Sequence, residues 1–242
     1  MKRILTGTES FEKLIEGDYF YVDKTMFIKE LLENKGEVTL ITRPRRFGKT
    51  LNMSMLKSFF DVRSDNKTMF GSLNIMRHKD IVEKRMNKYP VVSFTMKNVE
   101  LLTYKESIET IRILVSELYQ QNLYVYESDR LNAQQKKRFH KYFSEEATDA
   151  EMRLSLSFLT QCLYAYHQKR AIILMDEYDA PIANALQEGY YQDMIKFMRS
   201  FMGSAFKSND YLEFGVLTGV QRVSKEGMVS SFNNPNGLIC QV

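Results

Sequence analysis

The sequence has few cysteines and no long apolar run, and both absences narrow the kind of protein it encodes. Its two cysteines, Cys162 and Cys240, supply neither a disulfide framework nor the spacing of a metal site. This favours an intracellular, reducing compartment. No stretch is long enough to cross a bilayer, and the N-terminus lacks the uninterrupted apolar region of a secretory signal. Together these absences predict a cytoplasmic protein without a membrane segment.

Repeats, linkers and clustered histidines are also lacking. His78, His140 and His167 have no partners at ligand spacing, so we expect surface or core roles for them. No internal repeat, low-complexity tract or Pro/Ser-rich linker marks a domain boundary. The 242 residues suit one α/β domain or one and a half. A formal net charge of +4 permits an anionic partner without identifying one.

The central motif is residues 43–50, which read Arg-Pro-Arg-Arg-Phe-Gly-Lys-Thr. An apolar run at 38–41 predicts a buried strand before it, and residues 51–60 carry apolar side chains at helical spacing after it. A strand, a loop ending in Gly-Lys-Thr and a helix are the context in which this motif indicates a phosphate-binding loop. Backbone amides at the start of the helix would surround an anion, and the helix dipole favours its charge.

The loop residues have separate chemical tasks. Gly48 lets the main chain approach a phosphate, Lys49 reaches the β and γ oxygens, and Thr50 offers its hydroxyl to Mg²⁺. Arg43 stands where the first glycine of the pattern belongs, and the proline after it favours extended backbone at the strand end. The alternative is an exposed basic turn between strand and helix.

A second motif supplies acidic groups. Residues 171–175 are apolar and predict a fully buried strand, which Asp176 and Glu177 follow. Ligands of α/β sheets bind beyond the carboxyl ends of strands, where both carboxylates would lie. Phosphoryl chemistry needs a carboxylate for Mg²⁺, a role that suits Asp176, and a group that orients water, which suits Glu177. Alone, an acidic strand end is often a solvated turn; a Gly-Lys-Thr loop in the same chain makes it informative.

Residues 211–218 predict a further strand. In the branch of phosphate-loop enzymes that has the catalytic glutamate next to the magnesium aspartate, a strand after the acidic one inserts beside the phosphate-loop strand, and similarity to that branch implies the same place here. Its end would face the γ-phosphate. Thr218 or Gln221 is therefore a candidate polar sensor, and Arg222 a candidate phosphate contact. For Arg222 two other questions stay open: whether it merely pairs with a surface acid, and whether it acts in its own subunit or a neighbouring one.

The rest of the sequence predicts a helical frame. Helical spacing indicates helices at 27–32, 104–123, 131–143, 150–167 and 190–206, and an apolar run indicates a strand at 90–96. Asp23 is a candidate cap for the first helix, and the aromatic residues 19–21 are interpreted as packing, with proximity to adenine as the alternative. Residues 61–88 show no clear period. The basic run at 136–141 is typical of a solvated helix face, with nucleic-acid contact as the less favoured interpretation.

Four spaced motifs together resemble one family. They are Tyr-Val-Asp-Lys-Thr at 21–25, the loop at 43–50, Leu-Met-Asp-Glu-Tyr-Asp at 174–179 and Leu-Thr-Gly-Val-x-Arg-Val-Ser-Lys-Glu at 217–226. In this order they look like the bacterial AAA-ATPase-like family, to about Asn234. The resemblance implies that Arg43 is that family's variant of the loop. It also implies a P-loop ATPase domain that is often followed by a PD-(D/E)XK nuclease-like domain; the sequence ends before such a domain, which predicts a truncated member.

We therefore expect a three-layer α/β P-loop NTPase fold with a mainly parallel sheet and helical insertions. The expected divisions are an N-terminal segment at 1–34 packed on the core, an ATPase domain at 35–234 and an abrupt end at 235–242. The predicted function is binding of ATP and Mg²⁺ with hydrolysis of the γ-phosphate. Predicted catalytic residues are Glu177, Lys49 and Arg222, and predicted magnesium ligands are Thr50 and Asp176. Predicted nucleotide-binding residues are Arg45, Arg46, Phe47, Gly48, Lys49, Thr50, Leu51 and Thr218.

Two other functions stay open. One is a nucleotide-dependent switch or interaction module that binds ATP with little turnover, and the other is a small-molecule kinase of the same broad fold. Glu177 directly after Asp176 argues against both, and the long insertion between the loop and the acidic strand also argues against the kinase, whereas the missing C-terminal part argues for the switch. No Asn-Lys-x-Asp motif is present, which favours ATP over GTP. A nucleic-acid partner follows from family analogy alone, and assembly into an oligomer is left open.

Overall fold

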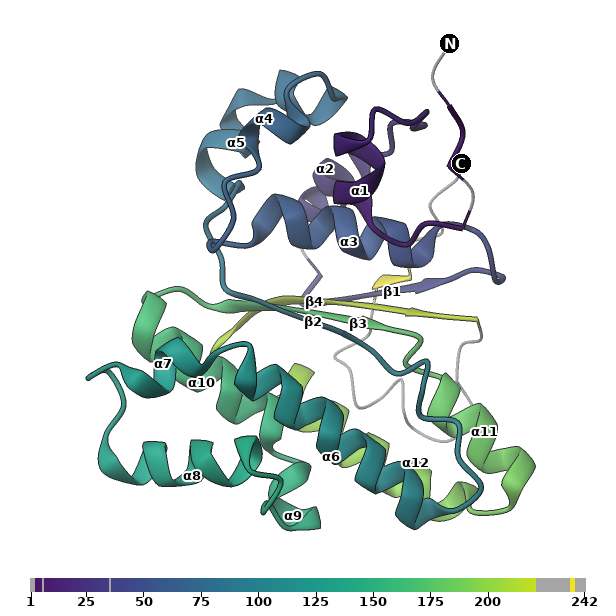
Figure 1. Ribbon diagram of the computed structural model, residues 1–242, viewed down its shortest axis with the longest axis vertical. Coiled ribbons are helices and arrows are strands. Elements are labelled where there is room, and N and C mark those ends of the chain that lie inside the picture. The colour runs from purple at the N-terminus through teal and green to yellow at the C-terminus, as the bar shows by residue number, and fades with distance from the viewer. Residues whose placement is uncertain (1–2, 6, 35, 221–235, 238–242) are drawn as a thin grey trace.

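The centre of the molecule is a five-stranded parallel sheet in the order β2-β3-β4-β1-β5 (Figure 1). This computed structural model describes residues 3–5, 7–34, 36–220 and 236–237. The strands are β1 (Val38–Thr42), β2 (Val91–Thr95), β3 (Ala171–Asp176), β4 (Leu212–Gly219) and β5 (Asn236–Gly237). The strands predicted from apolar runs are confirmed, because strands of a parallel sheet are buried on both faces and read as continuous apolar sequence.

Helices cover both faces of the sheet (Figure 1). One layer holds α1 (Phe11–Glu16), α2 (Met26–Glu33), α3 (Lys49–Phe60), α4 (Lys67–Phe70), the 3-10 helix Asn74–Arg77 and α5 (Lys79–Arg85). The other holds α6 (Tyr104–Gln120), α7 (Leu123–Glu127), α8 (Ala133–Phe143), α9 (Asp149–Met152), α10 (Ser155–His167), α11 (Ala180–Glu188) and α12 (Tyr191–Phe206). The predicted three-layer α/β class is confirmed.

Strand β4 lies between β1 and β3, which confirms the expected place beside the strand that precedes the phosphate loop. Its register pairs Thr218 with Ile41 on one side, and Leu217 with Met175 on the other. Because all these strands are parallel, the carboxyl ends of β1, β3 and β4 meet at the same edge of the sheet. The strand before the phosphate loop, β1, and the acidic strand, β3, are therefore separated only by β4.

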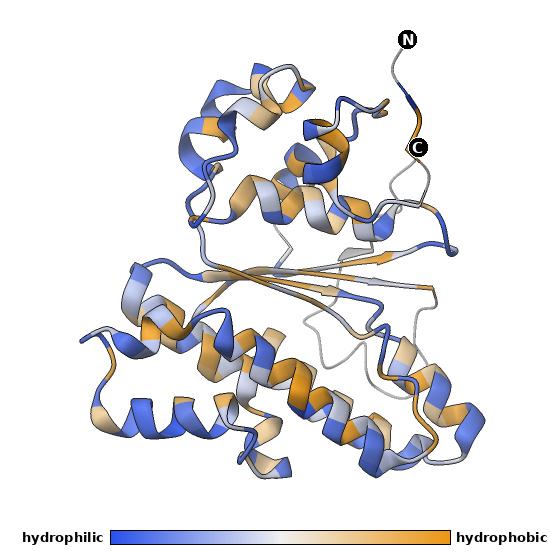
Figure 2. Ribbon diagram, in the orientation of Figure 1, coloured by the Kyte–Doolittle hydropathy of each residue, from blue (hydrophilic) through white to orange (hydrophobic). Residues whose placement is uncertain are grey.

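Alternating side chains of β3 divide the core into two clusters. Ile173 and Met175 pack with the helices on one face, and Ile172 and Leu174 pack with those on the other. This is the period of two expected for a strand. Figure 2 shows the matching pattern in the helices that pack on the sheet, where hydrophobic residues gather on the inner side and hydrophilic residues on the outer side. Helices therefore pack on both faces of the sheet whose carboxyl edge carries Asp176 and Thr218.

Several local predictions are wrong in detail. The single helix predicted at 150–167 is two, α9 and α10, separated at residues 153–154. Helix α9 has its own capping box, in which the Thr148 and Glu151 side chains each bond the other's backbone amide. Helices α7 and α11 have no counterpart in the prediction, and α11 begins with Pro181 in its first turn. Residues 61–88, which show no period, form three short helical segments.

Asp23 does not cap α2. Thr25 occupies the N-cap position with helical backbone angles and makes no capping bond with its side chain. The Asp23 carboxylate instead accepts from the Thr25 amide and hydroxyl through one oxygen and from the Asn74 amide, at 2.7 Å, through the other. The Thr25 hydroxyl in turn accepts from the Ile75 amide. The Tyr-Val-Asp-Lys-Thr motif thus attaches the N-terminal segment to the 3-10 helix.

Candidate nucleotide site

The loop between β1 and α3 has the backbone of an anion-binding turn. Gly48 precedes the first residue of α3 with φ 72°, and Arg46 has φ 70°. A side chain at Gly48 would meet nothing within 4 Å, so the need for glycine comes from backbone conformation rather than space. The Gly48 carbonyl accepts the first helical bond, from the Asn52 amide at 3.0 Å. The free amides at the start of α3 therefore point into the loop.

Lys49 is folded onto the loop itself. Its side chain belongs to the first residue of α3 and is almost buried, with 7% of the residue exposed. The Nζ atom donates to the carbonyl oxygens of Arg43 at 2.9 Å and Pro44 at 3.0 Å. The loop thereby holds an ammonium group within its own curve. Arg43, at the position of the first glycine, extends β1 through a bond from its amide to the Gly219 carbonyl.

The Asp176 carboxylate joins three elements. One of its oxygens accepts from the Thr50 hydroxyl of α3 at 2.6 Å, and the other accepts from the Thr218 hydroxyl of β4. Asp176 is 5% exposed. The parallel register makes this possible, because it brings the end of β4 beside the end of β3. The predicted pair Thr50 and Asp176 is therefore in direct contact.

Glu177 follows with a left-handed backbone, φ 52°. Such a conformation is uncommon for a non-glycine residue, and the Glu177 amide is held by a 3.3 Å bond to the Thr218 hydroxyl. Burial, and next the charge of Asp176, raise the pKa of the Glu177 carboxyl above its ordinary 4.5. Three nearby cations oppose this rise in pKa: Lys97, Lys49 and Arg45.

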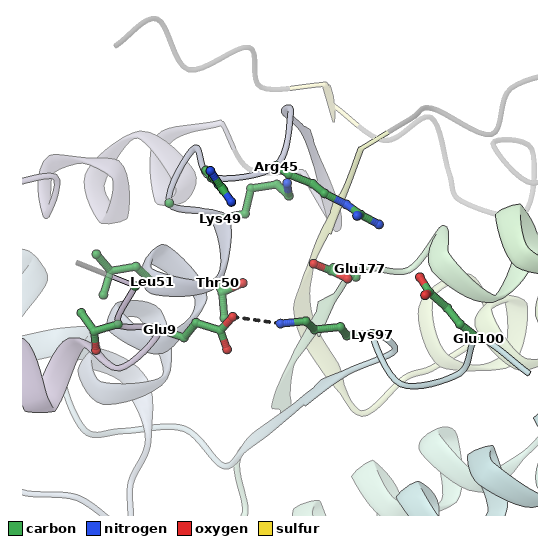
Figure 3. Close-up of a pocket in the computed structure, with 12 residues that line it drawn as sticks. Glu9, Arg45, Lys49, Thr50, Leu51, Lys97, Glu100 and Glu177 are labelled. Atoms are coloured by element: carbon green, nitrogen blue, oxygen red, sulfur yellow. Dashed lines mark hydrogen bonds and ion pairs between the residues drawn. The ribbon is translucent and has the colours of Figure 1, made fainter.

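A cavity of about 780 Å³ lies at this edge of the sheet (Figure 3). That volume is within the range of small-molecule sites. Its lining residues are Gly7, Thr8, Glu9, Arg45, Arg46, Gly48, Lys49, Thr50, Leu51, Lys97, Glu100 and Glu177. Seven of the predicted residues thus meet at one cavity.

Other predicted residues lie outside its lining. Phe47 projects from the loop and is 60% exposed. Asp176 and Thr218 lie behind the cavity wall, and Thr218 is fully buried. Its hydroxyl already serves Asp176 and the Glu177 amide. Gln221 and Arg222 lie outside the described residues.

Two groups of lining residues escape prediction from sequence. Gly7, Thr8 and Glu9 come from the N-terminal segment, and Lys97 and Glu100 follow β2. Lys97 Nζ lies 3.2 Å from an oxygen of Glu9. A signal for Lys97 does exist, because it follows a predicted strand whose carboxyl end borders the ligand edge. The N-terminal residues have no such signal, since α1 sets their place by packing on α3.

Comparison with known proteins identifies the family. A family model described as predicted AAA-ATPase matches residues 5–229. The chain belongs to this family. It is 27% identical over 235 residues to a protein of Azotobacter chroococcum mcd 1 described as an uncharacterized protein in the vnfD 5' region. That match covers 96% of the chain and 40% of the relative, so the chain spans less than half of that protein. No solved structure matches.

Membership of the predicted AAA-ATPase family supports a nucleotide-binding, ATPase-like domain. Proteins bind Mg²⁺ through one or two carboxylates plus substrate phosphates. The Thr50 hydroxyl and the Asp176 carboxylate of this AAA-ATPase-like chain fit that requirement. Among the described residues, no cluster of three or more His, Cys, Asp or Glu could hold a metal by itself. In the same part of the chain, no helix is long and apolar enough to span a membrane.

Proposed function

We propose that this domain binds ATP with Mg²⁺ and hydrolyses it to ADP and inorganic phosphate. The observation that carries the proposal is the bond from the Thr50 hydroxyl to Asp176, with Glu177 next in sequence on the wall of the same cavity. Phosphoryl transfer needs a phosphate cradle, a carboxylate for the metal and a group that orients water. The phosphate loop and Glu177 line one cavity and Asp176 lies behind its wall, an arrangement that supports these three roles.

The phosphate loop supplies binding. In our proposal the amides at the start of α3 and the Lys49 ammonium contact the phosphates, and Lys49 exchanges its two carbonyl partners for phosphate oxygens. Arg45 and Arg46 add positive charge at the rim, and Leu51 offers an apolar contact. Thr50 and Asp176 would hold Mg²⁺, which neutralises charge on the phosphates. Phe47 stays a predicted contact at the exposed tip of the loop.

Glu177 supplies the water-activating group. Its carboxylate would accept a proton from the attacking water as the new bond to the γ-phosphorus forms and the bond to the β–γ bridging oxygen breaks. Thr218 enters the proposal through its bonds to Asp176 and to the Glu177 amide. Arg222 stays a proposed phosphate contact. The division at residues 34 and 234, a nucleic-acid partner and assembly into an oligomer stay predictions.

The test is Mg²⁺-dependent phosphate release from ATP by the parent chain, Lys49→Ala and Glu177→Gln. We expect Glu177→Gln to lower turnover at least about 100-fold, the size typical of losing a general base, and Lys49→Ala to lower turnover through the loss of its phosphate contact. Lys49→Ala should also lose nucleotide binding, whereas Glu177→Gln should retain it. A parent chain that binds ATP but releases no more phosphate than Glu177→Gln would instead establish the alternative, a switch module with little turnover.

A further inference from the structure

Lys97 is placed at the cavity by the sheet. It follows β2, whose last residue, Thr95, pairs in register with Asp176 of β3. The Met96 amide continues this pairing with a 2.9 Å bond to the Asp176 carbonyl. Lys97 therefore leaves the sheet at the same edge as Glu177, one strand away. Its ammonium is near enough to interact with the charges of both acidic residues.

Lys97 differs from the other cations of the cavity in its origin. Among the described lining residues, Arg45, Arg46 and Lys49 all belong to the phosphate loop, whereas Lys97 does not. Figure 3 shows Lys97 entering from the side opposite Arg45 and Lys49, with Glu177 between them. A phosphate chain anchored by one end on the loop would carry its terminal phosphate toward Glu177 and hence toward Lys97.

The present partner of Lys97 is easily exchanged. Its ion pair with Glu9 spans 3.2 Å, and the two side chains are 55% and 62% exposed. Exposed pairs of this kind stabilise a fold little, because water screens them and two long side chains must be ordered. A phosphate oxygen carries more charge than one carboxylate oxygen and would lie inside the cavity, where charge-assisted bonds are stronger.

We propose that Lys97 is a second phosphate-binding cation, which leaves Glu9 and contacts the γ-phosphate of bound ATP. The proposal rests on the proposed function, since it requires a nucleoside triphosphate in this cavity. Lys97 would then make the protein bind ATP more tightly than ADP, because ADP has no γ-phosphate for it to contact. It also connects occupation of the γ-phosphate site to the N-terminal segment, because Glu9 loses its partner when Lys97 moves.

The test is calorimetric titration of the full chain with ADP and with the slowly hydrolysed analogue ATPγS, both with Mg²⁺. Lys97→Met removes the charge, Lys97→Arg keeps it, and Glu9→Gln removes only the partner. Lys137→Met, at an exposed lysine of α8, controls for overall charge. We expect Lys97→Met to bind ATPγS about tenfold more weakly than the parent and ADP within twofold. Lys97→Arg should stay close to the parent, and Glu9→Gln should bind ATPγS at least as well.

Two results would overturn the assignment. Equal weakening of ADP and ATPγS by Lys97→Met, reproduced by Glu9→Gln, would mean that the ion pair only shapes the N-terminal segment. Unchanged binding of both nucleotides would mean that Lys97 is a solvated surface lysine. Failure of the proposed function looks different: a parent that binds neither nucleotide removes both proposals, whereas a parent that binds ATPγS selectively but does not hydrolyse ATP removes hydrolysis alone.

Discussion

At the residue scale, the Thr218 hydroxyl is the point where the acidic strand and β4 are joined. It donates to Asp176 and accepts from the Glu177 amide, and the residue is fully buried. The Tyr178 amide adds a bond to the Thr218 carbonyl at 3.0 Å. These bonds hold Glu177 in its left-handed conformation. Thr218 therefore fixes the Asp176 carboxylate and the Glu177 backbone, and its predicted contact with nucleotide stays a prediction.

Replacing Thr218 by valine, which keeps the shape of the side chain, tests this role. The half-buried Glu177 amide would lose its acceptor and the buried Asp176 carboxylate would lose a donor, and leaving a buried polar group without its partner costs about 1–3 kcal/mol. We expect Thr218→Val to unfold at lower urea concentration and to lower turnover at least about tenfold, with ADP affinity within twofold of the parent. Thr218→Ser, which keeps the hydroxyl, is the matched control. Parent-like turnover in Thr218→Val would show that the hydroxyl does not orient the site.

At the element scale, the short helix α9 depends on Glu151. Its carboxylate accepts from Lys141 of α8 at 2.7 Å and from the Thr148 amide at 2.9 Å. The bond from Lys141, followed by that from the Thr148 amide, lowers the pKa of Glu151 from 4.5 to about 2. A pKa that is lower in the folded state means that this carboxylate stabilises the fold above about pH 4.5 and stops doing so as the pH falls toward 2.

Glu151→Gln should therefore destabilise the protein in a pH-dependent way. Glutamine still accepts from Thr148, so the main loss is the charge that faces Lys141. We expect a loss of about 0.5–1 kcal/mol at pH 7. In urea unfolding at pH 7, 5 and 3.5, the difference from the parent should shrink at the lowest pH. Glu188→Gln, at an exposed carboxylate, should show no such loss, and a pH-independent difference for Glu151→Gln would contradict the assignment.

At the scale of the whole molecule, the cavity joins segments that are distant in sequence. Its lining comes from four segments: residues 7–9, residues 45–46 with 48–51, residues 97 and 100, and residue 177. Two contacts of Phe11 hold residues 7–9 in place. The Phe11 amide donates to the Ser54 hydroxyl of α3 at 3.0 Å, and the Phe11 ring packs against the ring of Phe70. A ligand in the cavity would contact all four segments only in the folded protein, so its binding should stabilise the whole fold.

Thermal unfolding tests this coupling. Ligand at 100 times its Kd stabilises the folded state by about 2.7 kcal/mol, and a domain of this size gains about 2–4 °C in Tm per kcal/mol. We expect ATPγS with Mg²⁺ to raise Tm by about 5–10 °C, and Lys49→Ala to abolish the rise. An unchanged Tm in the parent at saturating nucleotide would argue against a nucleotide at this cavity.

Local sequence patterns succeeded where the structure depends on contiguous residues. The loop at 43–50, the buried acidic strand and the strand at 211–218 are examples, because apolar runs and a Gly-Lys-Thr turn report the conformation of their own backbone. They failed where a distant contact decides. Asp23 bonds to Asn74, 51 residues away, instead of capping α2. The start of α9 is a different case, because its capping box joins Thr148 to Glu151 only three residues away and is a local signal that the prediction of one helix at 150–167 missed.

The sequence by itself determined the family and the α/β class, and it named the candidate residues for phosphate chemistry, since each of these is written in short continuous motifs. Only the tertiary structure decided what surrounds them. Lys97 reaches the cavity through the register of β2 with β3, and Glu9 through the packing of α1 on α3. The Thr218 hydroxyl contacts Asp176 and the Glu177 amide because β4 pairs in register with β3. Spacing along a chain reports which face of its own element a residue occupies, whereas neighbours across a sheet edge depend on how separate elements pack.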